Sequence, residues 1–154
     1  FVPLPYVPME APMHLKGKSR RGPSFREAIL MHSVSRIAFK GLINNIQTSW
    51  VKMGQEGVQA CLNAGANDIG GTLMNESITR AAGADHGQEW HPQGIEETII
   101  SMGRKPKMRT TSYDEAPQSR RELAFRASTL TQIENTAAAK LQRSKKLDNI
   151  AQVL

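Results

Sequence analysis

Residues 65–76 have the sequence Gly-Ala-Asn-Asp-Ile-Gly-Gly-Thr-Leu-Met-Asn-Glu, and this stretch decides the fold class. A short strand over 66–70 opens through the pair Gly70-Gly71 into a helix over 75–82, which Gly83 ends. A strand followed by glycines and a helix is typical of a βα unit that delivers polar groups to a ligand. The stretch therefore predicts an α/β protein with a site at the end of this strand.

Two comparable units precede this stretch and one helix follows it. The other predicted elements are an extended segment over 1–7, a helix over 24–41, a strand over 45–51, and helices over 55–64 and 92–102. Strands that alternate with such helices indicate βα units and a parallel sheet. Because a complete (β/α)8 barrel of the TIM type needs about 250 residues, we expect the last three or so βα units of a larger barrel.

The helix over 24–41 has the best-defined start, the capping box Ser24-Phe-Arg-Glu27. Its predicted apolar face comprises Phe25, Ala28, Ile29, Val34, Ile37 and Ala38. Cys61 lies on the apolar face of the next helix and is expected in the core.

The segment 114–154 differs from 1–113 in composition, because it has no glycine and one proline. Apolar residues recur at near-helical spacing at positions 130, 133, 137, 141, 147, 150 and 154. The pattern fits two alternatives equally: an amphipathic helix that docks on the body or a partner, or a partly disordered extension. We therefore place a domain boundary between residues 113 and 114.

Composition excludes several classes of protein. No apolar run approaches the roughly 20 residues that a membrane span needs. The single cysteine rules out an internal disulfide and suits a reducing compartment, so we expect a cytoplasmic protein. The net charge is +6, but aromatic residues make up 5% of the chain and do not alternate with the basic runs, which argues against nucleic-acid binding.

Polar candidates cluster after each predicted strand, where the loops of a parallel barrel converge on the active site. The first group is Tyr6, Met9 and Glu10; the second is Asn45, Gln47, Ser49, Trp50 and Lys52; the third is Asn67, Asp68, Gly70, Gly71, Thr72 and Glu76. Glu10 is either a hydrogen-bond acceptor or base, or an exposed loop carboxylate. Lys52 suits a carboxylate or phosphate. The glycines allow close backbone approach to a ligand.

Other candidates are weaker. His86 and His91 are five residues apart with Asp85 and Glu89 beside them, a spacing that matches no standard metal site. His32 is expected to be a packed or surface histidine rather than a base. No residue can be assigned a catalytic role, and no CxxxCxxC motif is present.

Five motifs carry a resemblance to a known family. They are Phe1 to Pro12, Asn45 to Gly54, Gly65 to Glu76, Arg80 to Gly87 and Arg109-Thr-Thr. In this order they resemble the C-terminal part of the FO synthase family, and more narrowly its radical S-adenosylmethionine (SAM) half, over about residues 1–113. Departures are Pro8, where the family usually has His, and Ser112, where Leu is usual.

The resemblance implies a radical SAM transferase acting in deazaflavin coenzyme biosynthesis. Its cofactors would be a [4Fe-4S] cluster and SAM, which yield a 5′-deoxyadenosyl radical. Its substrates would be L-tyrosine, the donor of a 4-hydroxybenzyl fragment, and 5-amino-6-ribitylamino-uracil. By analogy Gln47, Asn67, Asp68, Thr72 and Glu76 would bind substrate or cofactor.

The cluster-binding segment is not in this sequence, so we expect the chain to be a fragment that needs a missing N-terminal barrel segment and is inactive alone. Two alternatives stay open. One is a non-catalytic binding module derived from a truncated barrel, and the other is a fragment of a related radical SAM enzyme of menaquinone biosynthesis.

Overall fold

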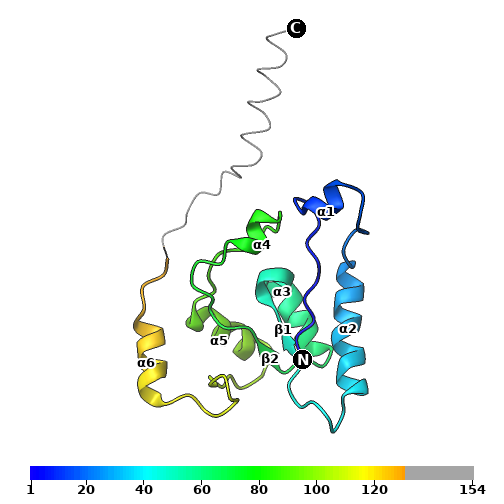
Figure 1. Cartoon of the computed structure of the whole chain (residues 1–154). Coiled ribbons are helices and arrows are strands. Elements are labelled where there is room, and N and C mark those ends of the chain that lie inside the picture. The colour runs from blue at the N-terminus through cyan, green and yellow to red at the C-terminus, as the bar shows by residue number, and fades with distance from the viewer. Residues whose placement is uncertain (131–154) are drawn as a thin grey trace, which may run out of the picture.

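The computed structural model describes residues 1–130, in which short strands alternate with helices (Figure 1). The elements are α1 (Pro12–Leu15), α2 (Phe25–Ala38), β1 (Gln47–Thr48), α3 (Trp50–Asn63), β2 (Asp68–Ile69), α4 (Ile78–Ala81), α5 (Pro92–Ser101) and α6 (Gln118–Arg126). The mixed helix and strand content agrees with the predicted α/β class. Residues 131–154, which hold most of the predicted amphipathic tail, lie outside the described part.

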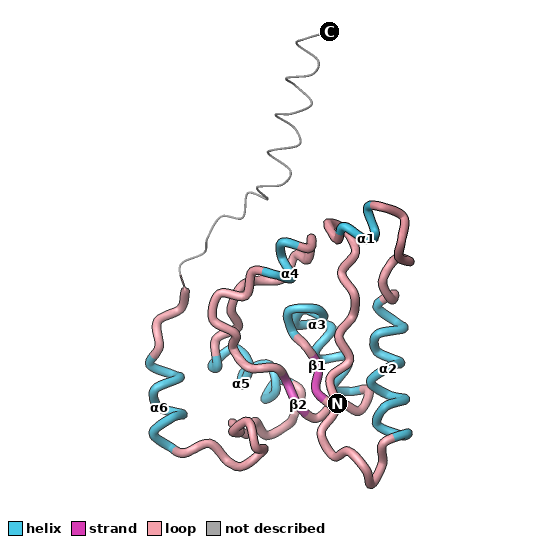
Figure 2. Tube along the Cα trace, viewed as in Figure 1, coloured by secondary structure: helices cyan, strands magenta, loops and turns pink. Residues whose placement is uncertain are grey.

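β1 and β2 form a parallel sheet in which Gln47 pairs with Asp68 and Thr48 with Ile69. The N-terminal segment runs beside β1 (Figure 2), where the Phe1 ammonium donates to Asn45 O and the Gln47 amide donates to Phe1 O, both at 2.8 Å. The order of the three segments along the sheet therefore follows the chain, as the βα pattern predicts.

Apart from this contact at Phe1, the segment over 1–7 forms no strand. The prediction of three comparable strands was therefore wrong. Pro3 and Pro5 have no N–H to donate to a ladder, and the pairing stops after Phe1. The other two strands are also shorter than predicted, with two residues each.

The predicted strand over 45–51 ends at Thr48 because helix α3 begins at Trp50. Gly54 interrupts α3 with φ 66° and ψ 178°. The helix predicted over 55–64 corresponds to the part of α3 after this kink. Trp50 and Lys52 therefore lie on a helical turn at the end of β1 and not on a strand.

Helix α2 packs against α3 through a face that differs from the predicted one. Its capping box is present, with the Ser24 amide 2.7 Å from Glu27 Oε2. The buried positions are Ala28, His32 and Ser35, whereas Val34 and Ile37 are 58% and 77% exposed. The predicted stripe was wrong for these two and also for Phe25 and Ala38, which are exposed. It was right for Ala28 and for Ile29, which is partly buried against the core. The fully buried side chains of α2 are small or polar.

The hydrophobic core lies between α3 and the sheet. Ile46, Val58 and Cys61 are fully buried, and Trp50 is 4% exposed. The prediction that Cys61 belongs to the core is confirmed. Within residues 1–130 no helix is long and apolar enough to cross a membrane.

The later elements agree with prediction to different degrees. Helix α5 begins at Pro92 and ends at Ser101, close to the predicted 92–102. The helix predicted over 75–82 is only the single turn of α4, and the short α1 was not predicted. Helix α6 is tied to α5 by an ion pair between Arg121 and Glu96. The boundary at 113/114 stays a prediction.

Candidate functional site

The two faces of the sheet have different environments. Thr48 is fully buried on the side where α3 places Cys61, so this face lies against the helices. Because neighbouring side chains of a strand point to opposite faces, Gln47 and Asp68 project away from the helices. These two residues are partners in the sheet register, so their side chains lie next to each other.

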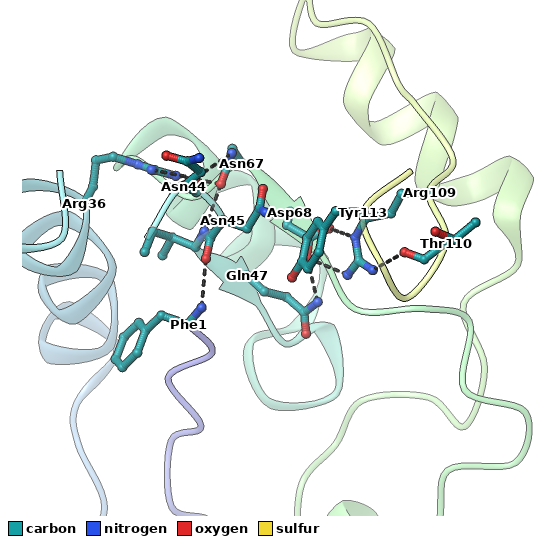
Figure 3. Close-up of polar contacts among 11 residues, drawn as sticks. Phe1, Arg36, Asn44, Asn45, Gln47, Asn67, Asp68, Arg109, Thr110 and Tyr113 are labelled. Carbon is teal, nitrogen blue, oxygen red and sulfur yellow. Dashed lines mark hydrogen bonds and ion pairs between the residues drawn. The ribbon is translucent and has the colours of Figure 1, made fainter. Parts of the chain in front are cut away.

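Asp68 is the centre of a polar network on that second face (Figure 3). Arg109 donates to both carboxylate oxygens, Nε to Oδ1 at 2.7 Å and Nη2 to Oδ2 at 2.6 Å. Gln47 Nε2 donates to Asp68 Oδ2 at 2.7 Å. A bidentate guanidinium–carboxylate pair is among the strongest charge-assisted hydrogen bonds. The network joins three segments that are far apart in the sequence.

Tyr113 completes the network from the loop after α5. Its ring centroid lies 4.2 Å from the guanidinium carbon of Arg109, a cation–π contact, and its hydroxyl donates to Asp68 Oδ2 at 3.4 Å. The hydrogen bonds to Asp68 raise the pKa of Arg109, against the smaller opposing effect of burial. With side-chain exposures of 10% for Asp68 and 26% for Arg109, the pair is only partly screened by water.

Asn67 directly precedes Asp68, the first residue of β2, and has a separate set of hydrogen bonds. Its Oδ1 accepts from Arg36 Nη2 at 2.6 Å and from the Ile46 amide at 2.9 Å, and its Nδ2 donates to Asn44 O at 3.2 Å. All its polar side-chain atoms are thus engaged within the chain. Asn45 lies beside it and meets Phe1 through its carbonyl (Figure 3). The prediction that Asn67 and Asn45 contact a ligand stays untested.

Trp50 and the glycine pair stand at the other end of the strands. Trp50 Nε1 donates to Gly71 O at 2.8 Å, and its ring packs edge-to-face on Trp90 at 6.2 Å. The Gly70 amide donates to Thr48 O, which continues the pairing beyond β2. A side chain added at Gly71 would meet nothing within 4 Å. Trp50 is thus a core residue, whereas the backbone at Gly71 is open to a ligand.

The remaining predicted residues lie in the surrounding loops. Glu76 Oε1 accepts from the Thr79 amide at the start of α4, while Oε2 is buried without a hydrogen-bond partner in residues 1–130. The Thr72 carbonyl accepts from the Trp90 amide at 3.4 Å. The Glu10 amide donates to Ala82 O, so the end of α4 meets the N-terminal segment. The Lys52 side chain lines a cavity with Tyr6 and Met9.

The two weaker histidine candidates are separated in space. His86 packs against Gly54 at the kink of α3, and His91 Nδ1 caps α5 by accepting from the Gln93 amide. His32 is fully buried, with Nδ1 2.7 Å from Ala28 O, as expected of a packed histidine. Residues 1–130 contain no group of three metal-binding side chains.

The sequence reasoning missed Arg109 and Tyr113 as site residues. Arg109 belongs to one of the five motifs that carry the family resemblance, and this membership was the sequence signal that could have identified it as a site residue. Nothing in the local pattern shows that a residue 41 positions after Asp68 returns to bind it.

The sequence of the chain matches one protein family and several known proteins. The family model described as "CofH/MqnC C-terminal region" matches residues 1–122. A 5-amino-6-(D-ribitylamino)uracil–L-tyrosine 4-hydroxyphenyl transferase of Methanocaldococcus jannaschii is 50% identical over 113 residues, which are 73% of this chain and 32% of that protein. The same-named protein of Methanopyrus kandleri is 48% identical over 114 residues, 74% of this chain and 31% of that protein.

An FO synthase of Mycobacterium leprae is 46% identical over 113 residues, which are 73% of this chain and 13% of that protein. The chain thus spans a third or less of the length of these curated relatives. No solved structure matches it significantly.

Proposed function

Because the chain belongs to the family of CofH/MqnC C-terminal regions, we propose that it forms the C-terminal, substrate-positioning part of a transferase. The complete enzyme would join the 4-hydroxybenzyl fragment of L-tyrosine to 5-amino-6-(D-ribitylamino)uracil. The relatives that carry this substrate pair in their names support the assignment. The chain would contribute binding groups and not the radical chemistry.

The observation that carries the proposal is the network of Asp68, Arg109 and Gln47 on the sheet face that points away from the helices. It offers the carboxylate of Asp68 together with the amide of Gln47 and the guanidinium of Arg109, both of which lie within 2.7 Å of the Asp68 oxygens. A uracil ring presents N–H donors beside C=O acceptors, and these three side chains supply the complementary acceptors and donors. The open backbone at Gly71 would border the same ligand.

The arrangement of the sheet supports an extension into a barrel. The segment at Phe1, β1 and β2 lie side by side in chain order, and a helix follows each of them. In a (β/α)8 barrel the face opposite the helices becomes the interior, so the network of Asp68 would face the barrel lumen. The side chains of the lumen would surround a ligand only after further strands complete the barrel.

A [4Fe-4S] cluster does not fit the residues of this chain. Its single cysteine, Cys61, is fully buried, and its sulfur lies 3.5 Å from His32 Nδ1. A cluster held by three thiolates therefore needs cysteines from another part of the complete enzyme. SAM, which binds to such a cluster in the family that the sequence resembles, would be held there as well.

The test is product formation by the complete enzyme that carries this chain, given both substrates and SAM under anaerobic reducing conditions. Asp68→Asn keeps the shape of the side chain but leaves a ligand donor without its charged acceptor, which costs about 1–3 kcal/mol. We expect tyrosine-dependent product formation to fall tenfold or more, with iron content unchanged.

Glu56→Gln is the matched control for this test, because it makes the same carboxylate-to-amide change at an exposed position of α3 outside the network. It should leave the activity per folded enzyme near that of the parent. An Asp68→Asn enzyme with normal kinetics would remove Asp68 from the site. An enzyme that turns over only the substrates of a menaquinone-pathway relative would overturn the proposed reaction.

A further inference from the structure

A cavity of about 300 Å3 lies apart from the network of Asp68. Its walls come from residues 5–9, residues 21–25, the first turn of α3 and the loop over 84–86 that follows α4. The first and third of these segments follow the extended segment at Phe1 and the strand β1. In parallel architectures this end of the strands is where loops converge to bind small molecules.

Close backbone contacts hold the walls of this cavity together. A Cβ at Gly22 would lie 2.1 Å from Tyr6 O, and one at Gly83 would lie 2.7 Å from Met9 Cβ. At Gly54, where φ is 66°, a Cβ would lie 2.5 Å from the His86 ring. Only glycine permits these approaches. The cavity is therefore bounded by loops that are packed tightly on one another.

The charged groups of the cavity are not satisfied by each other. Lys52 and Arg21 supply positive charge and Asp85 supplies negative charge, and all three line the same cavity. None of their side chains forms a hydrogen bond or ion pair with any of residues 1–130. Phe25, Met53 and Val7 give the cavity apolar walls.

We propose that this cavity binds a free amino acid, with Lys52 holding the α-carboxylate and Asp85 the α-ammonium group. The apolar walls would hold the side chain, and Arg21 would add to the positive potential near the carboxylate. A volume of about 300 Å3 is at the lower end of ligand pockets and suits a ligand of this size. This inference rests on the proposed function in taking L-tyrosine as the amino acid.

The test is calorimetric titration of the full chain with L-tyrosine and two analogues. Tyramine lacks the carboxylate, and 3-(4-hydroxyphenyl)propanoate lacks the ammonium group. Lys52→Met should weaken L-tyrosine binding at least tenfold and leave tyramine binding unchanged. Asp85→Asn should weaken L-tyrosine binding at least tenfold and leave 3-(4-hydroxyphenyl)propanoate binding unchanged.

The control variants are Lys16→Met and Asp114→Asn, which remove exposed charges outside the cavity and should bind L-tyrosine like the parent. A thermal melt of each variant verifies folding, and the pairing of each variant with one analogue cannot arise from a general loss of structure.

The inference is overturned if L-tyrosine does not bind, or if Lys52→Met weakens tyramine as much as L-tyrosine. It is also overturned if Asp68→Asn abolishes L-tyrosine binding while Lys52→Met and Asp85→Asn do not, a result that leaves the proposed function standing. The expected pairing together with a complete enzyme that forms no product would instead support the cavity and reject the proposed reaction.

Discussion

At the residue scale, Asp68 is the side chain on which Arg109, Gln47 and Tyr113 converge. Its carboxylate is 10% exposed, so the guanidinium of Arg109 compensates a charge that water reaches poorly. Removal of one member of such a pair leaves the other without compensation, which costs more than the pair itself contributes. Arg109 therefore positions Asp68 in addition to the donor that we propose it offers to the ligand.

Arg109→Met should lower the free energy of unfolding by about 1–3 kcal/mol, because Asp68 loses both charge-assisted hydrogen bonds. Arg109→Lys should restore only part of this loss, since an ammonium group cannot bind both oxygens in the fork geometry. Urea denaturation gives the values. Arg26→Met, which removes an exposed arginine, is the control; an equal shift for both variants would contradict the role of Arg109.

Cys61 makes the free energy of unfolding depend on pH in the alkaline range. Burial raises the pKa of its thiol, outweighing the opposing effect of the neighbouring Thr48 side chain. Above the unfolded-state value of about 8.5 the unfolded chain loses the proton while the folded chain keeps it, so stability falls as pH rises. Below that value both states are protonated and the contribution is fully present.

We therefore expect Cys61→Ala to flatten the decline in stability above about pH 8.5. The measurement is the urea midpoint of parent and variant at several pH values, compared by slope because the substitution also changes packing. Identical slopes in the two proteins would show that Cys61 does not contribute.

At the element scale, α3 combines a turn at the end of β1 with a longer helix, and Gly54 makes the break between them. A positive φ is accessible to glycine at little cost and is unfavourable for residues with a Cβ. The break turns the chain so that His86 packs directly on the backbone. It thereby joins α3 to the loop after α4.

Gly54→Ala should be destabilising by at least about 1 kcal/mol, because alanine must adopt a left-handed conformation and its Cβ meets the His86 ring. Gly71→Ala is the matched control, since its added Cβ meets nothing within 4 Å. Thermal melts of both variants test this. A Gly54→Ala protein as stable as Gly71→Ala would show that the break is not required.

At the scale of the whole molecule, Arg36 and Asn67 join segments that the sheet alone would not hold together. Arg36 of α2 donates to Gly65 O, to Asn44 O and to Asn67 Oδ1. Asn67 in turn accepts the amide of Ile46, a fully buried residue. With strands of two residues, these side-chain contacts supply much of what a longer ladder would provide.

Asn67→Ala should accelerate hydrogen exchange at the Ile46 amide, which loses its acceptor, and lower the melting temperature. Asn45→Ala is the control, because the contact of Asn45 with Phe1 runs through its backbone carbonyl. Unchanged protection at Ile46 in the Asn67→Ala protein would mean that this contact does not hold β1 in place.

The sequence by itself determined the features that depend on neighbours along the chain. The Ser24–Glu27 capping box, the start of α5 at Pro92 and the α/β alternation follow from local hydrogen bonding and backbone preference. The resemblance carried by five motifs agrees with the family match over residues 1–122. These signals survive because tertiary contacts do not compete with them.

Only the tertiary structure decided which side of α2 is buried, where the strands end and which side chains meet Asp68. The burial of His32 in place of Ile37 depends on how closely α2 approaches α3. Arg109 reaches Asp68 because the loop after α5 folds back over the sheet. Such contacts join residues far apart in the chain, so their geometry is set by packing and cannot be derived from local periodicity.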